Sequence, residues 1–125
     1  MWSHLLVERM TGEEHVIFDG TPRSLHEAQI IDTAITFYNR PRPHVIYLNI
    51  SREAASKARM IARRRMDDIN PEEIERRLNW FEADVIPAVE YFRQHSNYNF
   101  VELNGDQPVE AIHKELLSKV FCKSN

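Results

Sequence analysis

The chain has 125 residues, of which 42% are hydrophobic and 28% are charged, and its formal net charge is −3. This composition fits one globular domain and excludes both a disordered chain and a strongly basic nucleic-acid binder. No apolar run approaches the roughly 20 residues that span a bilayer. Because the N-terminal stretch lacks a secretory signal pattern and Cys122 is the single cysteine, we expect a cytoplasmic protein.

Strand patterns and helix patterns alternate along the chain. Short apolar runs rich in β-branched and aromatic residues predict strands at residues 16–18, 45–48 and 100–103. Apolar residues spaced three or four apart predict helices at residues 2–10 and 25–38, and three further helices that begin near Ser51, near Pro71 and after residues 106–108. Ser51 is expected to cap one helix, Pro71 to begin a long helix that Pro87 kinks, and residues 106–108 to precede the last helix.

This alternation predicts an α/β layer fold with a parallel sheet, in a single domain that covers residues 1–125. Ligands of such sheets bind at the carboxyl ends of the strands. We therefore expect residues 19–23, Ser51 and residues 104–108 to share one edge of the sheet.

A basic cluster lies at residues 57–65 and contains Lys57, Arg59, Arg63, Arg64 and Arg65. Arg59 and Arg63 are four residues apart, so a helix would project both from one face. Guanidinium groups aimed at one place suit phosphate, but charge pattern alone favours a solvated basic face balanced by nearby glutamates. RNA binding is a further alternative that the sequence does not favour, because no aromatic residues are interleaved for base stacking.

Four stretches, taken together and in this order, resemble the adenylate kinase family of nucleoside monophosphate kinases. They are "FDGTPRS" at the expected end of a strand, "RRRMDDINPEEIERRLNWF", "DVIPAVEYF" and "VELNGDQPVEAI". The similarity covers essentially the whole chain. It implies a P-loop-kinase-like layer fold, of which this chain holds three strands with flanking helices, and transfer of the γ-phosphoryl group of ATP to a nucleoside monophosphate with Mg²⁺.

The resemblance also implies roles for individual residues. Arg23, with Gly20 and Glu27, would bind the acceptor monophosphate, and Asp19 would orient water on Mg²⁺. Arg59 would lie against the base of ATP, and the main-chain groups of Gly105 and Gln107 would lie near the same base. The residues that would clamp the transferring phosphates are Arg63, Arg65 and Arg77. Phosphoryl transfer depends mainly on positioning and charge neutralisation, which a ring of arginines supplies.

The sequence departs from the family pattern in three places. Glu27 stands where the family usually has a glutamine that reads the acceptor base, so the resemblance leaves the acceptor nucleoside open. The lid, around residues 63–68, is very short. None of the 3 glycines, Gly12, Gly20 and Gly105, is followed by lysine, so the sequence contains no G-x-x-x-x-G-K loop.

We accordingly expect the C-terminal portion of a kinase core that lacks its P-loop strand and is inactive alone. In the resembled fold, the P-loop strand lies between the strands expected at residues 16–18 and 45–48. We expect its place to be taken by closure of these two strands on each other, by self-association with another chain, or by a missing N-terminal half. A non-catalytic module that binds nucleotide or a protein partner is the alternative from another functional class.

Overall fold

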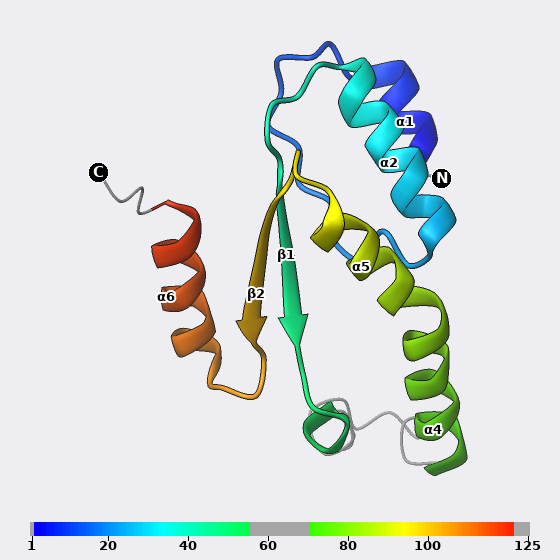
Figure 1. The fold of residues 1–125 in the computed structure, drawn as a ribbon, viewed down its shortest axis with the longest axis vertical. Coiled ribbons are helices and arrows are strands. Elements are labelled where there is room, and N and C mark those ends of the chain that lie inside the picture. Colours follow the sequence, from blue (N-terminus) through cyan, green and yellow to red (C-terminus); the bar gives the residue numbers. More distant parts are fainter. Residues whose placement is uncertain (1, 56–70, 122–125) are drawn as a thin grey trace.

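The computed structural model describes residues 2–55 and 71–121. Helices and strands alternate along them (Figure 1). The elements are α1 (Trp2–Arg9), α2 (Leu25–Phe37), β1 (His44–Asn49), α4 (Pro71–Trp80), η2 (Phe81–Val85), α5 (Ile86–Gln94), β2 (Asn99–Asn104) and α6 (Val109–Val120). Residues 52–55 are also helical. The expected α/β class is confirmed.

β1 and β2 form a two-stranded parallel sheet, which confirms two of the expected strands. Ile46 pairs with Val101, and Leu48 pairs with Leu103. Figure 1 shows α5 and α6 on opposite sides of this sheet, as in α/β folds whose parallel strands are covered on both faces. Leu103 is fully buried, whereas Leu48 opposite it is 46% exposed, so the cover is more complete over β2 than over β1.

The expected strand at residues 16–18 is not a strand in the structure. These residues have no regular secondary structure, and Ile17 is 92% exposed. An apolar run becomes a strand only when a neighbouring strand satisfies its backbone groups, and within the described residues β1 pairs with β2 alone. The apolar pattern of residues 16–18 could not reveal whether such a neighbour is present.

The core lies between α2, α5 and one face of the sheet. Its buried members are Ala28, Ile31, Ala88, Phe92 and Tyr98. Val45 and Phe100, which are paired across the sheet, pack against this cluster from the strands. The same cluster holds α2 beside α5, and thereby fixes the segment that precedes α2.

Ser51 caps a helix as expected, since its hydroxyl accepts a hydrogen bond from the Ala54 N–H at 3.2 Å. Ser24, which was not among the expected caps, caps α2 by accepting a hydrogen bond from the Glu27 N–H. The long helix leaves α-geometry just before Pro87, where the Ile86 N–H bonds to the Phe81 carbonyl five residues back. Because proline has no N–H and its ring crowds the preceding turn, a π turn at this position has an identifiable cause.

No helix within residues 2–55 and 71–121 is both long and apolar enough to cross a membrane.

Candidate functional site

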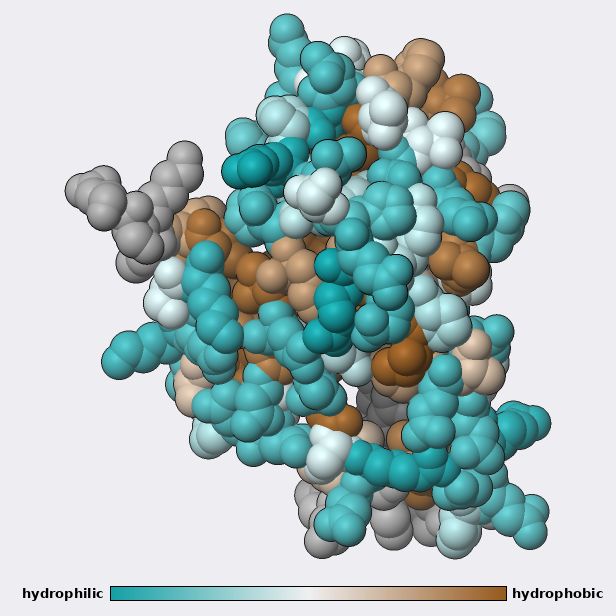
Figure 2. Space-filling model, in the orientation of Figure 1, coloured by the Kyte–Doolittle hydropathy of each residue, from teal (hydrophilic) through white to brown (hydrophobic). Residues whose placement is uncertain are grey.

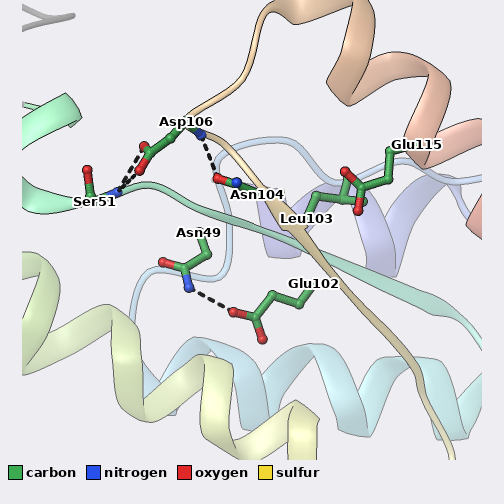
Figure 3. A pocket seen from close by; sticks show the side chains of 7 residues that line it. All are labelled: Asn49, Ser51, Glu102, Leu103, Asn104, Asp106 and Glu115. Atoms are coloured by element: carbon green, nitrogen blue, oxygen red, sulfur yellow. Dashed lines mark hydrogen bonds between the residues drawn. The ribbon is translucent and has the colours of Figure 1, made fainter.

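A hollow of about 430 Å³ lies where β1 and β2 end (Figure 3). It is lined by Asn49, Ser51, Glu102, Leu103, Asn104, Asp106 and Glu115. This is the edge of the sheet at which the sequence predicted a ligand site. Of the residues expected at this edge, Ser51, Asn104 and Asp106 line the hollow, whereas none of residues 19–23 is among its lining residues.

Hydrogen bonds join the loop after β1 to the loop after β2. The Gly105 N–H donates to the Asn49 carbonyl at 2.7 Å. The Ser51 N–H donates to both carboxylate oxygens of Asp106, at 3.0 and 3.3 Å, as Figure 3 shows. The Asp106 N–H in turn donates to the Asn104 side chain at 2.9 Å. These contacts set the two loops at a fixed distance from each other.

Gly105 occupies a position where a side chain does not fit. A Cβ atom on this residue would collide with the Ile50 side chain and would lie 3.2 Å from the Asn49 carbonyl oxygen. In the same loop, the side-chain amide of Gln107 donates to the Asn104 carbonyl at 2.9 Å and to the Glu115 carboxylate at 3.0 Å. The loop is therefore closely packed and internally bonded.

The hollow is acidic rather than basic. Hydrogen bonds from Asn49 and then Arg93 lower the pKa of Glu102, and hydrogen bonds from Lys119 and then Gln107 lower the pKa of Glu115. Both side chains are therefore carboxylates at neutral pH. Carboxylate and amide oxygens accept hydrogen bonds, so this part of the edge suits donor groups of a ligand, such as an exocyclic amine, rather than a phosphate.

The turn at residues 19–27 forms its own set of hydrogen bonds. The Arg23 side chain donates from Nε to the Gly20 carbonyl at 2.6 Å, and Gly20 adopts a left-handed backbone with φ +71°. The Glu27 carboxylate accepts from the Arg23 N–H at 2.7 Å and from the Thr21 hydroxyl at 3.2 Å. Glu27 thus holds the turn together, in addition to any contact with a ligand.

Comparison with known proteins identifies the family. An adenylate kinase of Prochlorococcus marinus (strain MIT 9515) is 32% identical over 104 residues, which are 83% of this chain and 55% of that protein. This chain belongs to an adenylate kinase-like family. An adenylate kinase of Oenococcus oeni is 30% identical over 93 residues (74% of this chain, 48% of that protein). Adenylate kinase 1 of Nostoc sp. is 27% identical over 110 residues (88% and 58%).

The chain spans about half the length of these curated adenylate kinases, between 48% and 58%. No protein-family model matches the chain, and no solved structure matches it significantly. The adenylate kinase-like assignment therefore depends on the curated relatives.

Among the arginines that resemble the phosphate clamp of adenylate kinases, Arg77 is described by the structure. Its side chain, 41% exposed, pairs with Glu73 at 3.2 Å on the same helix. Hydrogen bonds from Arg76 and also from Arg77 lower the pKa of Glu73. Arg59, Arg63 and Arg65, and with them the short lid expected around residues 63–68, lie outside the described residues.

Sequence reasoning missed two features of this adenylate kinase-like chain. Ser24 and Glu27 have the S-x-x-E spacing of a capping box, which would have indicated a structural task for Glu27. Arg52 lies beside Ser51 and contacts Glu75, Asn79 and Glu82. The spacing of these acceptors, i, i+4 and i+7, marks one helix face, but no sequence signal indicates that Arg52 reaches it.

A magnesium ion bound with nucleotide needs few ligands from the protein. Mg²⁺ that travels with nucleotide is held largely by phosphate oxygens and water, with one or two carboxylates. Asp19 is an exposed carboxylate at the end of the apolar run, which fits a contact through water. Within the part of the chain that the structure describes, no three His, Cys, Asp or Glu side chains gather as a self-contained metal site.

Proposed function

We propose that this chain is part of a nucleoside monophosphate kinase that transfers the γ-phosphoryl group of ATP to a nucleoside monophosphate. The match to adenylate kinases over 74% to 88% of the chain carries this proposal. The ligand-sized hollow at the carboxyl edge of the parallel sheet supports it, because ligands of α/β folds bind at this edge.

In the proposed reaction an oxygen of the acceptor phosphate attacks the γ-phosphorus of ATP. The bond from that phosphorus to the oxygen bridging to the β-phosphate breaks, and ADP leaves. Mg²⁺, when bound with ATP, would neutralise charge on its phosphates. Arg63, Arg65 and Arg77 would stabilise the charge on the transferring group, since fixed cations act strongly in a site that excludes water.

The substrates are assigned to the two ends of this arrangement. Arg23, with Gly20 and Glu27, would hold the acceptor monophosphate, and Asp19 would hydrogen-bond water on Mg²⁺. Arg59 would lie against the base of ATP, where Gly105 and Gln107 supply main-chain groups. The acidic lining of the hollow supports a base rather than a phosphate at this end, because carboxylates repel phosphate.

A coupled assay for ADP formation tests the activity of the chain alone. The 125-residue sequence has no G-x-x-x-x-G-K loop, whose N–H groups and lysine cradle the β- and γ-phosphates. We therefore expect the purified chain to bind nucleotide without turning it over. Turnover of about one per second or faster, which is typical of kinases, would refute this inactivity.

A non-catalytic nucleotide-binding or partner-binding module is the second candidate, favoured by the same missing loop. Co-expression with a segment that supplies a P-loop distinguishes the two candidates. Gain of ATP-dependent phosphorylation of a nucleoside monophosphate is expected for the kinase, and continued inactivity of a stable complex for the module.

Exposed apolar residues support self-association of the isolated chain. Figure 2 shows apolar patches over α1, α2 and α6 on an otherwise largely hydrophilic face. The exposed side chains of these helices include Val7, Phe37 and Leu117. Exposed apolar side chains of this kind can promote association when they meet the same surface of another copy. Light scattering across a concentration series tests the proposal, and a monomer at every concentration would contradict it.

A further inference from the structure

Arg52 binds three side chains of one helical segment. Its Nη1 donates to Glu82 at 2.5 Å, and its Nη2 donates to Glu75 at 2.6 Å and to Asn79 at 2.9 Å. The hydrogen bonds to Glu82 and then to Glu75 raise the pKa of Arg52. A guanidinium is planar and carries donors in a rigid fork, so it can serve several acceptors at once.

The three acceptors lie along two turns of the segment formed by α4 and η2. Contacts at positions i, i+4 and i+7 follow one stripe of a helix, and holding a stripe fixes the rotation of the helix about its own axis. Arg52 therefore fixes both the place and the rotation of α4, which begins 19 residues after it in the sequence.

The other end of this link is the carboxyl edge of the sheet. Arg52 follows Ser51, whose N–H is bound by Asp106 and whose side chain caps the same helical turn. Asp106 belongs to the loop that contains Gly105, and this loop is bonded to β1. The loop after β2 is thus hydrogen-bonded to Ser51, and the next residue in the chain, Arg52, is hydrogen-bonded to α4.

Arg77 lies on the flank of α4 away from this stripe. At about 100° per residue, its side chain is roughly 200° around the helix from Glu75. On that flank it pairs with Glu73. The rotation of α4 consequently decides where the Arg77 guanidinium points relative to the loop at Gly105.

We infer that Arg52 is a positioning residue for the proposed ATP site: by holding one stripe of α4, it fixes where Arg77, on the opposite flank of the same helix, lies relative to the loop after β2. This inference rests on the proposed function and assigns Arg52 no contact with nucleotide. Loss of Arg52 should therefore weaken the contacts of the protein with the phosphates of ATP and leave its contacts with the base unchanged.

Isothermal titration of the purified 125-residue chain with ATP and, separately, with adenosine tests this inference. Arg52→Ala should weaken ATP binding about two- to fivefold, since single exposed charge contacts have effects of this order, and should change adenosine binding less than twofold. Arg52→Lys keeps the charge and can reach one or two of the acceptors, so it should recover part of the ATP affinity. Arg9→Ala, which removes an exposed arginine of α1, is the matched control and should change neither affinity.

Glu82→Ala removes one acceptor of Arg52 on the helix. If Arg52→Ala fails to fold, this variant should show the same loss of ATP affinity with unchanged adenosine affinity. Equal ATP affinity in the unaltered chain and both variants would overturn the inference alone. An equal loss of ATP and adenosine affinity would also overturn it, because it would indicate a merely structural role. Failure of the unaltered chain to bind ATP would overturn the proposed function, and the inference with it.

Discussion

The carboxylate of Asp106, just after β2, accepts two hydrogen bonds from the backbone N–H of Ser51, just after β1, at 3.0 and 3.3 Å. A side chain of one loop thereby satisfies the backbone of the other at the edge where a ligand is expected. The contact joins residues 55 positions apart in the sequence. Together with the hydrogen bond from the Gly105 N–H to the Asn49 carbonyl, this carboxylate holds the two loops of the candidate site together.

Asp106→Ala should lower the free energy of unfolding by about 0.5–1.5 kcal/mol, the usual net value of an intramolecular hydrogen bond. Asp106→Asn keeps one acceptor oxygen and should lose less. Urea unfolding at neutral pH measures both. Equal stability of the alanine variant and the unaltered chain would show that the contact with Ser51 contributes nothing.

Gly105→Ala should destabilise the chain by about 1–3 kcal/mol, because the added methyl group collides with Ile50 and presses on the Asn49 carbonyl. The half-exposed Ile50 offers a rescue. Ile50→Ala alone should cost little, and in the Gly105→Ala background it should restore most of the lost stability. If the double variant is no more stable than Gly105→Ala, the collision with Ile50 is not the cause.

Tyr98→Phe should cost about 1.5–3 kcal/mol, because it removes a buried hydroxyl that donates to Asp32 at 2.5 Å. Burial, and then the contact with Asp32, raise the pKa of Tyr98 well above its ordinary value of 10.0. A raised folded-state pKa gives stability that is present below about pH 10 and is lost as the pH rises further. The variant should therefore lose less stability than the unaltered chain above pH 10, and parallel pH profiles would contradict this expectation.

Glu14→Gln should flatten the loss of stability in acid. The hydroxyl and the N–H of Thr11 donate to the Glu14 carboxylate at 2.6 and 3.0 Å and lower its pKa to about 2. A depressed pKa gives stability that is present above the unfolded value of 4.5 and is lost as the pH falls toward 2. Unfolding measured at several pH values between these limits tests this, with Glu13→Gln as the control that removes a neighbouring charge without these hydrogen bonds.

In a kinase restored with a P-loop segment, Arg23→Ala should weaken the monophosphate more than ATP, and Arg59→Ala should do the reverse. Each arginine is assigned to a different end of the transferred group. Charge-assisted phosphate contacts have effects of about ten- to a hundredfold in affinity. Titration with each ligand separately measures the two effects, and equal effects of both substitutions on both ligands would discard these roles.

Local order was largely determined by the sequence itself. The strands at β1 and β2 follow from short runs of β-branched and aromatic residues, and the start of α2 follows from Ser24. The π turn before Pro87 follows from the N–H that proline lacks. Each of these features depends on residues within about five positions of one another, so the local sequence is enough to predict it. The motifs that carry the family resemblance are equally local.

Only the tertiary structure decided which groups meet. The apolar run at residues 16–18 forms no strand, since strand formation needs a neighbour that no local pattern supplies. Tyr98 reaches Asp32 across 66 positions, and Arg52 reaches Glu82 across 30. Such contacts form because burial of the α2–α5 core and closure of the loops bring distant segments together. A hydrogen bond then forms wherever a donor meets an acceptor, and residue identity alone does not determine that position.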